Sequence, residues 1–282
     1  MCSKVFQILV VFTMLCMGKG QPGLRIIGGK DAEEKEYPFV VRLQILLTIL
    51  DTNTDYRFHV CTGALIAPTW TVTAAHCEPE EIITESYTQV PYILAGTVTD
   101  ALMKFKDAAK LVKKFIIHPS NRIIVIEVRN DIALIKNEAV TLPQYARVSA
   151  IGATTLIGLE ATATGYGITN ESFLVGDATT LHKPLQTLDV LVVQCGEVQR
   201  EMLFPRLCVA RRCRHSAGLC PGDSGGPLLH ASGVIGVNTL GPQQLERFCA
   251  NQPTDPIYDV AAITPIDSFI GWIRNTMEQD SL

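Results

Sequence analysis

The sequence carries no strong excess of charge of either sign. Its 24 Lys and Arg residues stand against 28 Asp and Glu residues over 282 positions, which gives a net charge of −4. The basic residues form no clustered patch, and no run of like charges marks an interaction tail. Composition therefore gives no reason to expect a nucleic-acid partner. Internal repeats and low-complexity tracts are absent as well, so a repeat architecture is not expected.

The sequence also lacks metal-ligand spacing and a membrane span after its first residues. The acidic cluster Glu78, Glu80 and Glu81 does not have the regular ligand spacing of a calcium loop, and we interpret it as a solvated loop. The apolar run Ile45 to Leu50 has the length of a strand and is far shorter than a spanning helix. We therefore expect no metal, no cofactor and no membrane partner.

The N-terminus contains the one long hydrophobic run. Residues Val5 to Met17 are almost wholly apolar, follow Lys4, and precede the small residues Gly18 and Gly20 that a signal peptidase would recognise. This pattern predicts a secretory signal over residues 1–20 and a secreted, extracellular protein. The alternative is an uncleaved anchor, but the run is short for a membrane span.

Nine cysteines are present, and Cys2 and Cys16 lie in the predicted signal. In a secreted chain the other cysteines indicate disulfides rather than a metal site. These seven residues are Cys61, Cys77, Cys195, Cys208, Cys213, Cys220 and Cys249.

After Gly29 the chain consists of short apolar or alternating runs separated by turn residues. The runs include Phe39–Leu43, Ala64–Ile66, Tyr92–Leu94, Ile132–Ile135 and Val234–Val237. Many short strands with Gly and Pro turns predict an all-β protein, either a barrel or a sandwich, and periodicity leaves both open.

One helix is predicted at the C-terminal end, over about residues 264–278. Thr264 is its expected N-cap, Pro265 suits the first helical position, and Asp267 has the spacing of a capping box. Apolar residues then follow at helical spacing, which predicts a helix packed by one face onto the rest of the protein. They are Ile266, Phe269, Ile270, Ile273 and Met277.

Four short motifs carry the chemistry, and in chain order they are Arg25–Gly29 (RIIGG), Thr73–Cys77 (TAAHC), Asn130–Leu134 (NDIAL) and Gly222–Pro227 (GDSGGP). Each alone has a structural explanation, such as a tight turn, a packed histidine or an aspartate that caps a strand. Together they present His, then Asp, then Ser, in the order of the chymotrypsin-type triad. From Ile26 to its end the chain resembles the chymotrypsin-like serine proteases.

The resemblance implies two six-stranded antiparallel β-barrels with the active site between them and a C-terminal α-helix. The first barrel would span about residues 26–140 and the second about 141–263, with residues 26–282 as the protease domain. Ser224 would be the nucleophile, His76 the general base and then acid, and Asp131 the group that orients the imidazole. The backbone N–H groups of Gly222 and Ser224 would form the oxyanion hole. Pro221 departs from the family, which more often has a long side chain there.

The resemblance also implies that the protein is made as a zymogen. A protease that cuts after Arg would remove a propeptide of residues 21–25 at the Arg25–Ile26 bond. The new α-amino group of Ile26 would then pair with Asp223 and order the oxyanion loop, so that cleavage acts as a conformational switch.

The family pattern further implies the disulfide pairs Cys61–Cys77, Cys195–Cys208 and Cys220–Cys249. Cys213 is left over, as a buried thiol, an intermolecular link or a competitor for Cys195. Separately, Asn170-Glu171-Ser172 is an N-glycosylation sequon, so Asn170 is a predicted site of glycosylation.

Substrate preference in the family is set mainly at the position six residues before the nucleophile, which is Gly218 here. A trypsin-like enzyme would carry Asp there to pair with Lys or Arg of the substrate. The sequence therefore predicts cleavage after apolar residues, with Asp255 or Asp259 as the alternative source of a charge. The predicted substrate-binding residues are Gly218, Leu219, Leu240, Gly241 and Pro256.

The leading hypothesis is thus a secreted, monomeric serine endopeptidase with protein or peptide substrates, an activating protease and protein protease inhibitors as partners. The alternative from another class is a catalytically weak homologue that binds a partner without cutting. A hydrolase of small esters would share the machinery, but the lipase order of Ser, Asp and His is absent.

Overall fold

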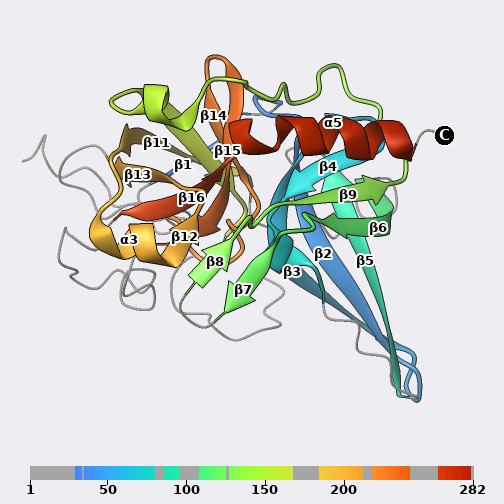
Figure 1. Cartoon of the computed structure of the whole chain (residues 1–282). Helices are drawn as coiled ribbons and strands as arrows, with labels where there is room; N and C mark the ends of the chain where they lie inside the picture. Colours follow the sequence, from blue (N-terminus) through green and yellow to red (C-terminus); the bar gives the residue numbers. More distant parts are fainter. Residues whose placement is uncertain are drawn as a thin grey trace, which may run out of the picture.

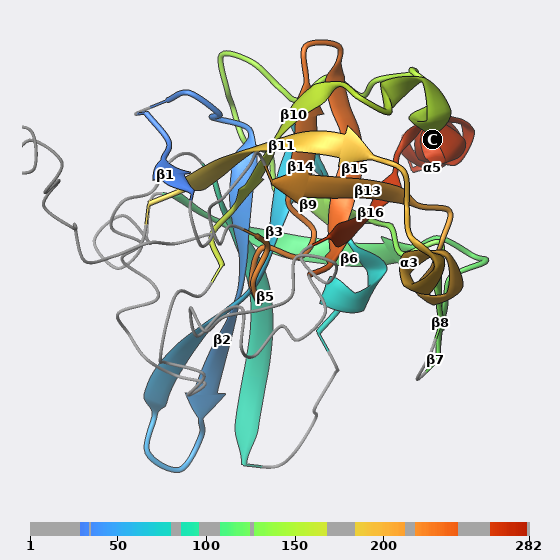
Figure 2. The same ribbon diagram turned by 90° about the vertical axis from the view of Figure 1, so that its left-hand side faces the viewer.

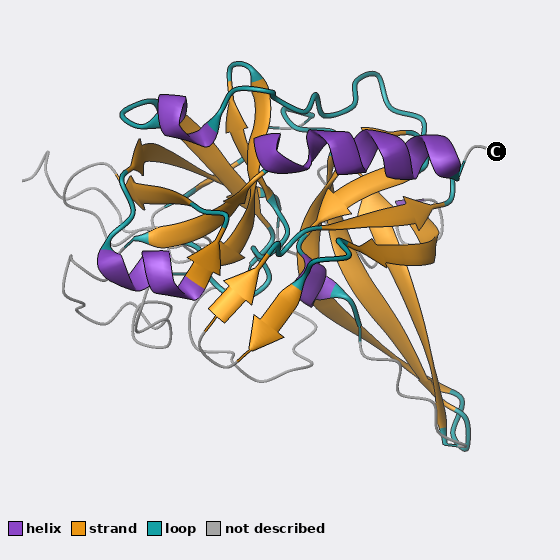
Figure 3. Cartoon of the chain, viewed as in Figure 1, coloured by secondary structure: helices purple, strands orange, loops and turns teal. Residues whose placement is uncertain are grey.

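The computed structural model describes residues 29–33, 35–79, 86–95, 108–124, 127–167, 184–211, 218–241 and 260–280. Within these ranges the chain is mostly strand, and the strands form two barrels that lie side by side (Figure 1). Colouring by secondary structure shows how few helices accompany them (Figure 3). The expected fold class, two six-stranded antiparallel barrels with a short C-terminal helix, is confirmed.

The first barrel closes in the order β2-β3-β4-β9-β6-β5. Its strands are β2 (Val40–Ile49), β3 (Thr54–Ala67), β4 (Trp70–Thr73), β5 (Tyr87–Ala95), β6 (Ala109–Ile117) and β9 (Ala133–Asn137). Strands β2, β3 and β5 extend past the barrel (Figure 2). The apolar run from Ile45 forms the far half of β2, where the side chains are only half-buried.

The second barrel is a ring of six strands that the β11–β13 pairing closes. Its strands are β10 (Glu160–Gly165), β11 (Gln186–Val193), β13 (Leu207–Arg211), β14 (Pro227–His230), β15 (Gly233–Leu240) and β16 (Ala261–Pro265). Strand β1 (Lys30–Asp31) pairs with β11 from outside the ring. Lys30 and Asp31 therefore belong to the sheet of the second barrel, although they lie within the range of about 26–140 expected for the first.

A small sheet joins the two halves of the chain beside the turn that contains Asn130. Strand β8 (Glu127–Arg129) pairs in parallel with β12 (Leu203–Phe204) and antiparallel with β7 (Arg122–Ile124). The N–H of Asn130 donates to the carbonyl of Phe204 at 2.8 Å. The turn that leads into β9 is therefore fixed by the second half of the chain. The remaining short elements are the helix α3 (Glu197–Met202) and the 3-10 helices η1 (Ala75–Cys77), η2 (Ala153–Leu156) and η5 (Asp267–Phe269).

The core of the first barrel continues into the space between the barrels. Side chains of the second half of the chain, including Tyr166, Leu185 and Val237, belong to the same buried apolar cluster as Val41, Leu43 and Leu134. A second cluster, with Leu188, Val209 and Ile263 among its members, fills the other barrel. Burial of apolar surface is the main favourable term in folding, so the barrels stabilise each other through this shared core.

The predicted start of the C-terminal helix is wrong. Thr264 and Pro265 are the last residues of β16, where they pair with Val237 and Gly236, and α5 (Ile270–Gln279) begins only after η5. The Thr264 hydroxyl is hydrogen-bonded to that of Thr239 at 2.8 Å and caps no helix. Strand pairing outweighs the local capping signal here, because it satisfies the backbone groups of a buried segment.

Helix α5 packs on the first barrel although it follows the second in sequence (Figure 1). His118 lies 5.1 Å from the rings of both Phe269 and Trp272, in edge-on contacts. Lys136 of β9 reaches Asp280 at the end of the helix at 2.8 Å, and this hydrogen bond holds the pKa of the Asp280 carboxyl below its ordinary value. Among the described residues, no helix has both the length and the apolar composition to cross a lipid bilayer.

The His118 contact predicts a pH-dependent contribution to stability. Burial lowers the pKa of His118 below its ordinary value, and its Nδ1 accepts a bond from the N–H of Ser120 at 3.2 Å. The fold therefore favours the neutral ring, and this stability is complete above the unfolded-state pKa of about 6.5 and is lost as the pH falls below it. We expect His118→Phe, which keeps the aromatic packing, to show a smaller fall in melting temperature between pH 7 and pH 5 than wild type. Equal falls in the two proteins would contradict this role for His118.

Candidate active site

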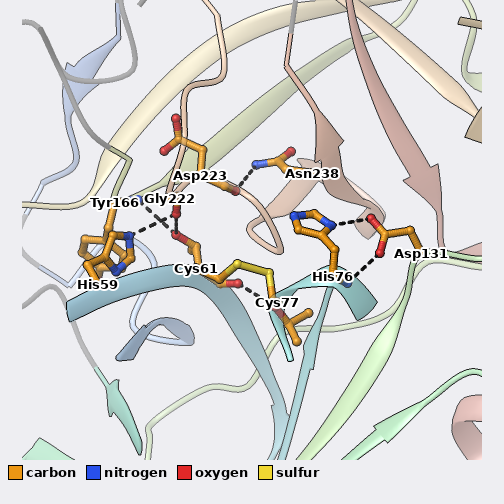
Figure 4. The surroundings of a disulfide bond; sticks show 11 residues. His59, Cys61, His76, Cys77, Asp131, Tyr166, Gly222, Asp223 and Asn238 are labelled. Carbon is orange, nitrogen blue, oxygen red and sulfur yellow. Dashed lines mark hydrogen bonds and ion pairs between the residues drawn. A yellow bond between two sulfur atoms is a disulfide. The ribbon is translucent and has the colours of Figure 1, made fainter. Parts of the chain in front are cut away.

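His76 lies in η1, directly after β4 of the first barrel. The disulfide between Cys77 and Cys61 of β3 joins this short helix to the barrel wall, with an S–S distance of 2.01 Å (Figure 4). The His76 side chain is 32% exposed, so its ring is open to solvent while its neighbours Ala75 and Cys77 are buried. The disulfide thus presents an accessible imidazole on a rigid support.

Asp131 fixes both the ring and the backbone of His76. One carboxylate oxygen, Oδ2, lies 2.7 Å from the ring Nδ1, and the other, Oδ1, accepts the His76 backbone N–H at 2.9 Å (Figure 4). The Asp131 side chain is fully buried. A carboxylate only accepts hydrogen bonds, so Nδ1 of the imidazole donates and Nε2 of the neutral ring is left with a lone pair. That nitrogen can take a proton from a hydroxyl.

Ser224 lies in a loop of the second barrel, just before β14. Its carbonyl accepts the backbone N–H of Thr62 at 2.8 Å, and Thr62 follows Cys61 in β3. The Ser224 loop is therefore bonded to the strand whose disulfide supports His76. This connection brings the three residues predicted from the motifs, which lie far apart in sequence, to the boundary between the barrels.

Gly222 occupies a position that disfavours a side chain. Its φ is +92°, and a Cβ there would lie 2.9 Å from the ring of His59. Its carbonyl accepts two hydrogen bonds, from the Thr62 hydroxyl at 2.8 Å and from His59 Nε2 at 3.1 Å. The carbonyl is thereby held toward β3 of the first barrel.

Asp223 is fully buried and points away from His76 (Figure 4). Its carboxylate accepts the N–H of Gly167 at 2.7 Å and the N–H of Cys220 at 2.9 Å. A Cβ on Gly165 or Gly167 would overlap this carboxyl group, so these glycines at the end of β10 and just after it leave the space that it fills. Asp223 therefore has a different task from Asp131, although it is the neighbour of Ser224.

Tyr166 links several of these groups. Its ring is fully buried, the Arg42 guanidinium lies 4.2 Å from the ring centroid, and His59 makes an edge-on contact with it at 6.3 Å. Burial raises the pKa of Tyr166 to about 12, so the phenol stays protonated at any physiological pH. Its hydroxyl donates to the carbonyl of Val40 at 3.4 Å.

The predicted pocket residues are described only in part. Gly218 and Leu219 are buried, and Leu219 packs in the core of the second barrel. Leu240, the last residue of β15, and Gly241 after it are partly exposed. Pro256 lies outside the described residues, as do Asp255 and Asp259.

Other expected residues also lie outside the described ranges. These are Arg25 and Ile26 of the activation site, Asn170 of the sequon, Cys213 and Cys249. The structure contains the disulfide Cys195–Cys208 as well as Cys61–Cys77, and Cys220 is disulfide-bonded too.

One group of possible metal ligands lies at the site. Sγ of Cys61, Sγ of Cys77 and a ring nitrogen of His76 are within 4.8 Å of one another. The two sulfur atoms are bonded to each other, however, and a disulfide offers no thiolate to a metal. Within the described residues the arrangement therefore fits proton transfer and nucleophilic attack better than metal binding.

Sequence reasoning missed four residues that hold the site: His59, Thr62, Tyr166 and Asn238. Asn238 of β15 donates from its side chain to the carbonyls of Thr164 and Asp223, at 3.1 and 3.2 Å. All four act across long sequence separations. The one local signal was that Thr62 follows Cys61, a predicted disulfide partner of Cys77.

Comparisons with known proteins agree with this geometry. The sequence model of the trypsin family matches residues 26–273. A trypsin of Phaedon cochleariae is 28% identical over 269 residues, which cover 91% of this chain and 90% of the relative. An anionic trypsin of Canis lupus familiaris is 27% identical over 262 residues and 91% of each chain. The structure of neuropsin, a serine protease expressed in the limbic system of mouse brain, matches with a TM-score of 0.63 at 20% identity, over 88% of this chain and 98% of that one.

Proposed function

The chain belongs to the trypsin family, and on that premise we propose that it is a secreted serine endopeptidase made as an inactive precursor. The proposal rests on the two hydrogen bonds between the buried Asp131 and His76. A disulfide joins the short helix of His76 to β3, and the Ser224 loop is hydrogen-bonded to the same strand. A hydroxyl is a weak nucleophile at neutral pH and needs such an oriented base.

In the proposed reaction the Ser224 hydroxyl attacks the carbonyl carbon of a peptide bond, and His76 Nε2 takes its proton. The charge that develops on the carbonyl oxygen is stabilised by the N–H groups of Gly222 and Ser224. His76 then gives the proton to the leaving amine as the C–N bond breaks, which leaves an acyl-enzyme. Water releases the acyl group by the same steps, with His76 again as base. Asp131 stabilises the imidazolium throughout.

Activation by cleavage of the Arg25–Ile26 bond is part of the proposal. The burial of Asp223 supports it, because a fully buried carboxylate favours a cationic partner such as an α-amino group. Loss of one partner from a buried ion pair typically costs about 3–5 kcal/mol, enough to decide whether a loop is ordered. The activator would be a protease that cuts after Arg. The paired cysteines and the apolar N-terminal run favour an extracellular location.

The alternative function is that of a homologue that binds a partner without cutting. The described part of the site argues against it. His76, Asp131 and Ser224 are all present, and the hydrogen bonds that orient His76 serve no purpose in a surface that only binds. Protein or peptide substrates, and protein inhibitors that imitate them, remain the partners that this site suits.

Substitution of the nucleophile tests the proposal. Ser224→Ala, cut after Arg25 like wild type, should lose about 10⁶-fold in kcat for peptide hydrolysis, because no other described group at the site can form the acyl-enzyme. Ser120→Ala, in an exposed turn, is the matched control and should retain wild-type rates. Both variants are measured on the same peptide substrate. Hydrolysis by Ser224→Ala at the wild-type rate would refute the mechanism.

Substrate preference gives a separate prediction. Gly218 is buried and carries no carboxylate, so a Lys or Arg side chain of the substrate would meet no charge from Gly218 or Leu219. We expect cleavage after Phe, Tyr, Leu or smaller aliphatic residues, with kcat/KM at least about tenfold above that for Lys or Arg. Profiling on peptides that differ only in the residue before the cut measures this directly. A preference for Lys or Arg would overturn the apolar pocket and direct attention to Asp255 and Asp259.

A further inference from the structure

Thr62 touches the nucleophile loop through both its side chain and its backbone. The residue is fully buried in β3 of the first barrel. Its hydroxyl accepts the backbone N–H of Tyr166 at 3.1 Å and donates to the carbonyl of Gly222 at 2.8 Å. Its backbone N–H donates to the carbonyl of Ser224 at 2.8 Å. A single residue of one barrel thus holds the two carbonyls on either side of Asp223 in the other.

These two carbonyls belong to the residues whose N–H groups would face the substrate. Gly222 lies at φ +92°, and a glycine can leave such a conformation at little cost. The fixed Gly222 carbonyl limits rotation of its own peptide group, between residues 222 and 223, and the fixed Ser224 carbonyl limits rotation of the group between residues 224 and 225. The peptide group between Asp223 and Ser224, which carries the Ser224 N–H, is therefore held from both ends.

The hydroxyl of Thr62 is itself held in place. Tyr166, which donates to it, is packed between Arg42 and His59, and Arg42 is the cross-strand partner of Thr62. The Thr73 hydroxyl donates to the Thr62 carbonyl at 2.9 Å. A buried hydroxyl with a fixed donor can direct its own hydrogen to only one acceptor, here the carbonyl of Gly222. His59 Nε2, at 3.1 Å from the same carbonyl, is a second donor to it.

We propose that Thr62 is a positioning residue that holds the oxyanion hole in its working geometry. The inference rests on the proposed function, since it assigns Thr62 a task in the same reaction. Thr62 touches no reacting atom. It acts by keeping the Gly222 and Ser224 N–H groups aimed at the position of the developing negative charge, and such preorganised donors need no rearrangement during the reaction.

Thr62→Val tests the proposal, because valine has nearly the shape of threonine and lacks the hydroxyl. We expect kcat to fall about tenfold with KM nearly unchanged, a smaller loss than the roughly 10²–10³-fold that follows removal of an oxyanion donor itself. Affinity for a peptide boronic acid, whose tetrahedral adduct occupies the oxyanion hole, should fall by a similar factor. Thr62→Ser, which keeps the hydroxyl, should behave like wild type in both measurements.

Thr71→Val is the matched control. Thr71 is a buried threonine of the same barrel whose hydroxyl donates to Asn137 at 3.0 Å, away from the nucleophile loop. It should lose stability without a change in kcat per active site, when sites are counted by titration with a serine reagent. If Thr62→Val does not fold, the comparison of Thr62→Ala with Thr62→Ser isolates the hydroxyl in the same way.

The outcomes separate the two proposals. The role of Thr62 would be overturned if Thr62→Val kept its kcat and its affinity for the boronic acid, or if Thr71→Val lost as much kcat as Thr62→Val. Cleavage of peptides by the wild-type protein would still support the proposed function in either case. A wild-type protein, cut after Arg25, that neither cleaves peptides nor reacts with the serine reagent would instead refute the proposed function. A loss confined to Thr62→Val and Thr62→Ala, with Thr62→Ser intact, is the result that supports Thr62.

Discussion

The burial of the Asp223 carboxylate is the constraint on which the rest of the site depends. A charge taken out of water must be met by donors or by an opposite charge, and the described structure supplies the N–H groups of Gly167 and Cys220. To accept those hydrogen bonds the loop must turn at Gly222, which has a positive φ. The position of Ser224 follows from this turn. The glycines at 165 and 167 follow from the same constraint, because larger residues would fill the space of the carboxyl group.

The boundary between the barrels is where these requirements meet. The first barrel contributes His76 and Asp131, braced by the Cys61–Cys77 disulfide and by the pairing of β8 with β12. The second contributes the Ser224 loop, which Thr62 bonds to β3. Relative movement of the barrels would change the distance from His76 to Ser224. The apolar cluster that both halves of the chain share, with Tyr166 and Leu43 among its members, resists that movement.

The sequence predicted the residues whose chemistry leaves a local pattern and missed those that act across the fold. His76, Asp131 and Ser224 stand in motifs with distinctive neighbours, and the barrels followed from the resemblance that those motifs carry. Thr62 and Asn238 lie in no motif, because a single hydroxyl or amide becomes important only through a partner more than a dozen residues away. Thr264 is the opposite case, because it has a clear local pattern and the helix N-cap predicted from that pattern is wrong. Its capping pattern is genuine as a local signal, but the pairing of β16 with β15 places it in a strand.

Active-site titration of Asp223→Asn, after the Arg25–Ile26 bond has been cut, tests most directly whether the Asp223 charge orders the site. Asparagine keeps the size of the side chain and removes its charge, so we expect a folded, cleaved protein in which few molecules react with the serine reagent. Wild type cut in the same way should titrate fully, and uncut wild type should not. Full titration of cleaved Asp223→Asn, or of the uncut wild-type chain, would contradict the claim that a buried charge at Asp223 orders the site.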